Sequence, residues 1–161
     1  MSESKRSTET TRRDVLRLGA ALALGGAAQA NAGPAAATPA EMQAAVAGVI
    51  GGARLNVGKV KLDIPPLVEN GNTVPCAVTV ASPMTAADHV KAIHVFAERN
   101  PQPYVIGVRL GPRAGRASIA TRMRLWDSQT VLAIAELSDG TFWSDRLNVI
   151  VTQGACLEDI L

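Results

Sequence analysis

The sequence lacks the residue groupings on which self-contained enzymes depend. It contains two histidines and two cysteines in 161 residues, and neither histidine has a metal-site spacing to a cysteine. No glycine-rich phosphate loop precedes a helical pattern, and no nucleophile can be paired with a base. We therefore expect no catalytic residue, no cofactor and no metal ion, and we interpret His89 and His94 as structural or surface side chains.

A long apolar run is also missing, which argues against a membrane anchor. The run at residues 16–28 is short and rich in Gly and Ala. With its basic start and small-residue cleavage sites, the segment 1–32 is typical of an export signal that is removed. Arg12 and Arg13 before this run favour the twin-arginine pathway; an ordinary secretory signal is the alternative. We expect a periplasmic protein without membrane insertion after cleavage.

The mature chain has no excess of positive charge. Five of the 16 basic and three of the 14 acidic residues precede residue 33, so the remainder is formally neutral. Nucleic-acid binding requires a basic surface that neutralises phosphates, and we do not expect it here.

One short helix is predicted near the start of the mature chain. Thr38, Pro39 and Glu41 combine a capping hydroxyl, proline at the first helical position and glutamate at the third. Apolar residues follow at helical spacing until Gly51 and Gly52. The helix packs on the body of the protein or docks on a partner; the sequence leaves both open.

The rest of the chain alternates as strands do. Pro- and Gly-containing turns separate about seven candidate strands, a spacing typical of a β-sandwich. We predict a mainly β protein, an antiparallel sandwich at residues 33–152 with one N-terminal helix, followed by a flexible arm at 153–161. The candidate strands are 59–64, 73–81, 91–97, 104–110, 116–125, 129–137 and 141–152.

The strand at 129–137 is apolar on both faces. Val131, Ala133 and Ala135 share one face, and Leu132 and Ile134 share the other. Either the domain covers both faces, or one face awaits another subunit.

The two cysteines occupy different settings. Cys76 shares a strand face with three valines, which favours a small buried hydrophobe. Cys156 lies five residues from the end and follows Gly154 and Ala155, so we expect an accessible thiol there. A Cys76–Cys156 disulfide is the alternative that two cysteines in an exported protein permit.

Five segments match the pattern of a known family. They are 68–75 (VENGNTVP), 93–101 (IHVFAERNP), 121–125 (TRMRL), 129–131 (QTV) and 135–143 (AELSDGTFW). In this order they resemble SoxY, the sulfur carrier of the bacterial thiosulfate-oxidising system.

This resemblance implies that the sandwich is immunoglobulin-like. It also implies a heterodimer with a second sandwich subunit, SoxZ, and transient contacts with Sox enzymes that include a haem c protein. It implies that Cys156 is the covalent attachment point for sulfur intermediates and that Gly154 gives the carrier arm flexibility. In the family, glycines flank the attachment cysteine on both sides. In this chain Ala155 precedes Cys156, and the ending Leu-Glu-Asp-Ile-Leu follows it. The alternative is therefore a diverged binding or structural sandwich whose tail is docked or disulfide-bonded.

Overall fold

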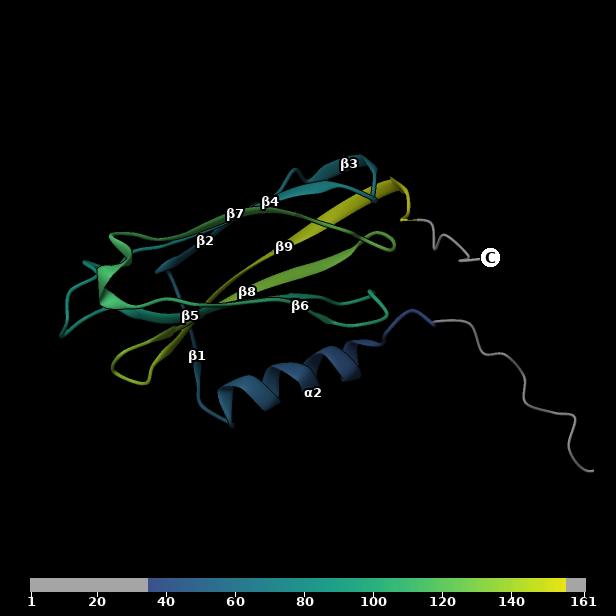
Figure 1. Ribbon diagram of the computed structural model, residues 1–161. Coiled ribbons are helices and arrows are strands. Elements are labelled where there is room, and N and C mark those ends of the chain that lie inside the picture. Colours follow the sequence, from purple (N-terminus) through teal and green to yellow (C-terminus); the bar gives the residue numbers. More distant parts are fainter. Residues whose placement is uncertain (1–34, 156–161) are drawn as a thin grey trace, which may run out of the picture. The chain divides into compact units, whose positions relative to one another are not determined.

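Two β-sheets and one helix make up residues 35–155, the part of the chain that the computed structural model describes (Figure 1). The predicted signal at 1–32 and the residues from Cys156 onward lie outside it. The mainly β sandwich with one N-terminal helix is confirmed. The elements are α2 (Pro39–Ile50), β1 (Leu55–Val57), β2 (Val60–Asp63), β3 (Leu67–Asn70), β4 (Val74–Val80), β5 (Val90–Ala97), β6 (Tyr104–Arg109), the 3-10 turn η1 (Pro112–Ala114), β7 (Ala117–Met123), β8 (Gln129–Leu137) and β9 (Phe142–Gln153).

The larger sheet has the strand order β1-β9-β8-β5-β6, and β3 also pairs with β9. The smaller sheet has the order β2-β4-β7. Most pairings are antiparallel, as predicted, but β1 and β3 both run parallel to β9. These two strands were not predicted, because β1 has only three residues and β3 has apolar residues at two adjacent positions, so neither alternates clearly.

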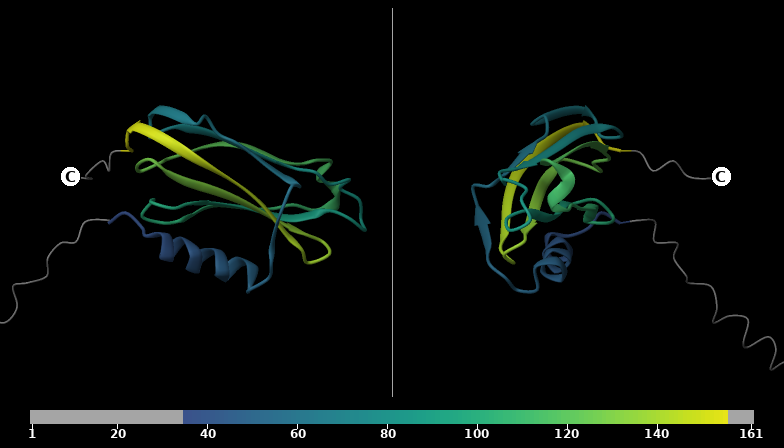
Figure 2. Two further views of the ribbon diagram at one scale, coloured as in Figure 1. Left: turned by 180° about the vertical axis from the view of Figure 1, so that it is seen from behind. Right: turned by 60° about the vertical axis from the view of Figure 1, so that its left-hand side comes forward.

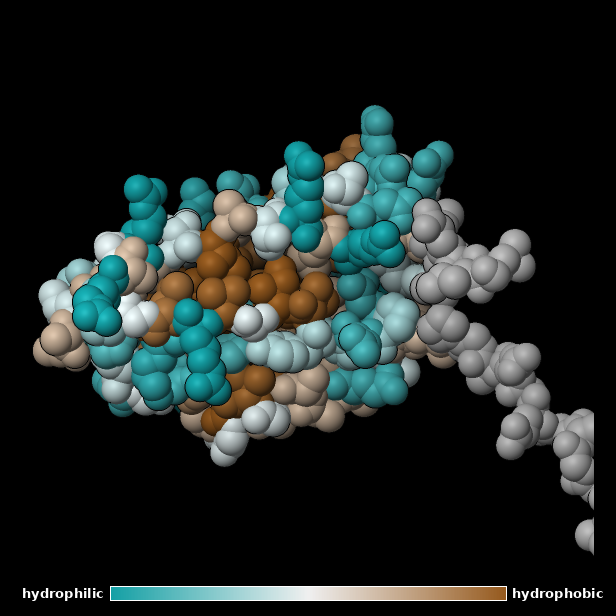
Figure 3. All heavy atoms as spheres, viewed as in Figure 1, coloured by the Kyte–Doolittle hydropathy of each residue, from teal (hydrophilic) through white to brown (hydrophobic). Residues whose placement is uncertain are grey.

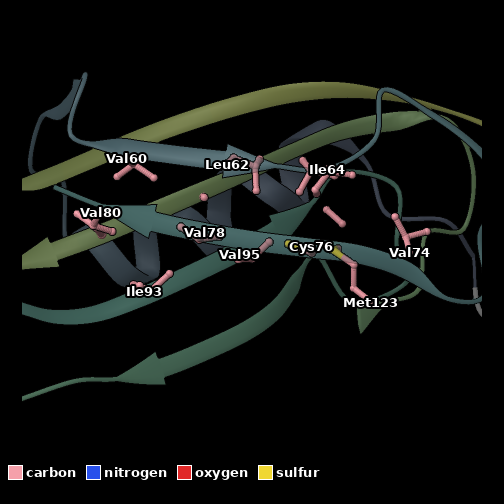
Figure 4. Packing of buried hydrophobic residues seen from close by; sticks show 14 of the residues in the cluster. Val60, Leu62, Ile64, Val74, Cys76, Val78, Val80, Ile93, Val95 and Met123 are labelled. Atoms are coloured by element: carbon pink, nitrogen blue, oxygen red, sulfur yellow. The ribbon is translucent and has the colours of Figure 1, made fainter. Parts of the chain in front are cut away.

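The main core fills the space between the two sheets. Val74, Cys76, Val78 and Val80 alternate inward along β4, which confirms the prediction that Cys76 is a buried apolar residue (Figure 4). Cys76 is a free cysteine with 2% of its surface exposed. Burial raises the pKa of its thiol to about 11, with the Asp63 carboxylate adding to the effect. A disulfide from Cys76 would therefore require access to the inside of the sandwich.

A second, smaller core lies on the outer face of the larger sheet. The helix α2 covers this face (Figure 2), where Val46 packs with Phe96, Ile134 and Phe142. Thr38 and Glu41 form the expected capping box at its start. The two apolar faces of β8 are thus covered within the domain, by the smaller sheet on one side and by α2 on the other.

Within residues 35–155 no helix is long and apolar enough to cross a membrane.

Candidate functional site

The backbone at the end of β9 is tied to two neighbouring loops. Gly71 donates its N–H to the Gln153 carbonyl oxygen at 2.7 Å, and Leu125 donates to the Gly71 carbonyl oxygen at 2.8 Å. Ala155 then donates to the Leu125 carbonyl oxygen at 3.0 Å. We call residues 153–155 the tail base. It leads directly into Cys156, the predicted attachment residue, which lies outside the described residues.

Two glycines permit this close approach of three backbones. A Cβ atom at Gly71 would lie 2.3 Å from the Leu125 carbonyl oxygen. One at Gly154 would lie 2.2 Å from the Trp126 carbonyl oxygen. Such distances exclude a side chain unless the backbone shifts. Gly154 was predicted to give the arm flexibility, and that role stays a prediction; the structure adds a steric reason for glycine at this position.

A buried polar network holds the loop that receives the tail base. The Asn100 side chain donates through Nδ2 to the Arg124 carbonyl oxygen at 2.8 Å. Its Oδ1 accepts from the Trp126 N–H and from Gln129 Nε2, both at 3.0 Å. Gln129 Oε1 in turn accepts from the Arg99 N–H at 2.8 Å. Because buried amides cost free energy when they lack partners, this network fixes the β7–β8 loop against the β5–β6 turn.

Two further contacts complete the same end of the sandwich. Val151 of β9 donates its N–H to Ser128 Oγ at 2.9 Å. Arg99 forms an ion pair with Asp127 at 2.9 Å, although both side chains are about half exposed. An exposed pair of this kind adds little stability, so the amide network is the stronger constraint on the loop.

The histidines lie away from the tail base. His94, on β5, shares a hydrogen bond of 2.9 Å between its Nδ1 and the Tyr104 hydroxyl on the outer face of the larger sheet. Burial lowers the pKa of His94. His89 precedes β5, and its backbone N–H donates a hydrogen bond to Ser138 Oγ. Among the described residues, no three or more His, Cys, Asp or Glu side chains gather as a metal site would require.

A hollow of about 710 Å³ lies between α2 and the outer face of the larger sheet. Met42, Val46 and Ile50 line it from the helix, and Leu132 and Arg146 line it from the sheet. None of the tail-base residues borders it. The candidate site therefore remains the end of β9 and the loops that hold it.

Comparison with known proteins decides which family this arrangement represents. The family model of the sulfur oxidation protein SoxY matches residues 46–156. The chain belongs to the SoxY family. SoxY proteins are carriers, which agrees with the expectation of a non-enzymatic subunit. No curated protein matches the sequence.

Solved structures share the fold. The sulfur carrier protein SoxY from Chlorobium limicola f thiosulfatophilum is 22% identical with a TM-score of 0.60, over 70% of this chain and 97% of that one. The superoxide reductase (neelaredoxin) from Ignicoccus hospitalis is 19% identical with a TM-score of 0.53, over 58% of this chain and 80% of that one. At these identities the similarity concerns the architecture alone.

Four of the five SoxY-like segments meet at the tail base, whereas 135–143 forms the β8–β9 hairpin at the other end of these strands. The segment 68–75 supplies Gly71, and 93–101 ends in the turn that carries Asn100. The segments 121–125 and 129–131 supply Leu125 and Gln129. Sequence reasoning singled out Gly154 but assigned no role to Gly71, Asn100 or Gln129. Their presence in the matching segments was the signal that could have found them.

Proposed function

We propose that this protein is the periplasmic sulfur-carrier subunit of a thiosulfate-oxidising system and that Cys156 holds the sulfur. The observation that carries the proposal is that the family match extends to residue 156 and so includes this cysteine. The rigid tail base supports it, because a defined origin restricts where a carried group can be presented. In this proposal, the twin-arginine signal at 1–32 directs the subunit to the periplasm, where it meets the SoxZ-type subunit and the Sox enzymes.

The loading step joins the Cys156 sulfur to the outer sulfur of thiosulfate. One S–S bond forms, the thiol loses its proton, and two electrons pass to an external oxidant, the haem c protein. The product is a cysteine S-thiosulfonate. The attacking species is the thiolate, so reactivity depends on a thiol that is accessible and not buried.

The two cysteines are suited to different tasks. Burial raises the pKa of Cys76 to about 11, which leaves almost no thiolate at neutral pH. Cys156 follows the tail base in a segment that also carries Glu158 and Asp159. Negative charge close to an anionic adduct opposes its formation, so loading is expected to be slower than with a glycine ending.

Intact-mass spectrometry tests the proposal. The purified SoxYZ-type complex is incubated with thiosulfate and the oxidised haem c protein. A single thiosulfonate adduct is expected on the wild type and on Cys76→Ala, but not on Cys156→Ala. An unmodified wild-type mass would contradict the proposal.

Thiol labelling separates the proposal from a docked or disulfide-bonded tail. Cys156 of the native protein is expected to react rapidly with iodoacetamide, whereas Cys76 reacts only after unfolding. Slow labelling of Cys156 without prior reduction, and fast labelling after it, would instead indicate a disulfide.

A further inference from the structure

One side of the sandwich is open where the edges of the two sheets face each other. β6 is the last strand of the larger sheet and β7 is the last strand of the smaller one. Within the described residues, β6 pairs only with β5, and β7 pairs only with β4. The turn η1 joins them at one end. Each strand therefore leaves one row of backbone N–H and C=O groups without a strand partner.

Partly buried apolar side chains line the gap between these two edges. Val105 and Ile106 of β6, Leu110 after it and Ile119 of β7 pack against the main core but are only partly buried. Figure 3 shows an apolar patch in the gap between the two edge strands. We call this gap, with these four residues, the open side. Contiguous apolar surface beside unpaired strand edges is typical of an interaction site.

The opposite side of the sandwich is closed. There β3 pairs with β9, and Leu62 of β2 donates its N–H to Asp145 Oδ2 of β9 at 2.9 Å. The smaller sheet is thus bound to the larger one through β2, β3 and β9. Within residues 35–155 no strand pairing joins β6 to β7, and the apolar residues at the open side are only partly buried.

Basic residues predominate in the segment that forms the open side. The segment 99–126 contains six arginines, no lysine and no Asp or Glu, although the mature chain as a whole is neutral. All six arginines are exposed. Within residues 35–155, Arg99 is the only one of these six that forms an ion pair, and its partner is Asp127. They are Arg99, Arg109, Arg113, Arg116, Arg122 and Arg124.

These arginines surround the gap. Arg109 lies on β6 and Arg122 lies on β7, along the two edges. Arg113 and Arg116 lie in or beside η1 at one end, and Arg124 lies at the other end in the loop that receives the tail base. A second copy of this chain would bring the same six positive charges against them, which opposes self-association through this side.

We propose that the open side binds a strand edge of a partner subunit that is apolar at its centre and flanked by Asp and Glu. The partner covers Val105, Ile106, Leu110 and Ile119, pairs with the free edges, and places its carboxylates against the arginines. The inference rests on the proposed function in one respect, namely that the partner is the SoxZ-type subunit. Arg99 and Arg124 lie at the end of the sandwich where the tail base is held. A partner bound to the open side would therefore lie beside the tail base, from which the chain continues to Cys156.

Charge reversal tests the proposal. Binding of the SoxZ-type subunit from the same organism is measured by calorimetry at low salt for the wild type and for Arg109→Glu/Arg113→Glu/Arg122→Glu. We expect the triple variant to raise the Kd about tenfold or more, since three attractions become repulsions. Added salt should raise the wild-type Kd and reduce the difference between the two proteins.

A matched control changes the same charge elsewhere. Arg54→Glu/Lys61→Glu/Arg146→Glu alters three exposed residues at β1, β2 and β9, away from the open side. It should change the Kd by less than about threefold. Thermal unfolding of both triple variants verifies that neither loses the fold.

Three outcomes would overturn the inference: equal Kd changes in the two triple variants, no binding by the wild type, or a wild-type dimer in sedimentation that the first triple variant disperses. The last would identify a second copy as the occupant. Loading of Cys156 is followed separately in the wild type by mass. A loaded protein with an unaffected Kd contradicts this inference and leaves the proposed function intact, whereas an unloaded protein with the expected Kd change does the reverse.

Discussion

Single residues determine how the tail base is built, and Gly154 is the most sharply constrained of them. A Cβ atom there would meet the Trp126 carbonyl oxygen, which belongs to backbone held by the Asn100 network and so cannot move freely. We expect Gly154→Ala to lower the free energy of unfolding by about 1–3 kcal/mol, as overpacking does. Urea denaturation measures it.

Gly111→Ala is the matched control for this substitution. Gly111 has an extended backbone, and nothing lies within 4 Å of a Cβ atom built on it. Its variant should be close to the wild type in stability. If Gly154→Ala is equally harmless but slows loading of Cys156, flexibility, and not close packing, is the reason for glycine at 154.

Cys76 makes the folded state sensitive to alkaline pH. Because burial raises the pKa of its thiol to about 11, the unfolded chain releases the thiol proton at a lower pH than the folded chain does. The contribution of Cys76 to stability is therefore complete below about pH 9 and is lost as the pH rises toward 11. Urea unfolding at pH 8 and at pH 10.5 should show a smaller loss for Cys76→Val than for the wild type. Equal losses in the two proteins would contradict the assignment.

At the scale of elements, α2 matters because it covers Phe96 and Ile134 on the outer face of the larger sheet. The Glu41 N–H donates to Thr38 Oγ1 at 3.3 Å, and the Thr38 N–H donates back to Glu41 Oε2 at 2.6 Å. The Thr38 N–H and the Thr38 hydroxyl both donate to the Glu41 carboxylate, and these two hydrogen bonds lower the pKa of Glu41.

Loss of this cap should loosen the helix. Thr38→Ala is expected to reduce stability by about 1 kcal/mol. Thr38→Ser keeps the hydroxyl and should restore most of it. Urea denaturation compares the two variants, and identical midpoints would show that the cap does not limit the stability of the domain.

The elements also show what could be predicted from the sequence. The capping box located α2, and alternation located β4 and β7, because both signals lie within a few residues. β1 and β3 escaped prediction because they are defined by parallel pairing with β9, more than 80 residues away. In the candidate site, Cys156 and Gly154 were predicted from the tail alone, and the role of each stays a prediction. The Asn100–Gln129 network was not, because only the fold brings these amides together.

For the whole molecule, counting charges gave an incomplete result. The mature chain is neutral in sum, and this balance excluded nucleic-acid binding without revealing how the charges are distributed. Six of its eleven basic residues fall in the segment that forms the open edges. A total cannot report such segregation, which becomes visible only when the strand order is known.

The arginines around the open side also bear on how the subunit survives alone. Two strand edges that have no partner within residues 35–155, beside apolar side chains, are a template for edge-to-edge aggregation. Positive charge along such edges makes any two copies repel each other before their backbones can pair. The same residues that would attract an acidic partner would therefore also oppose aggregation of the subunit before assembly.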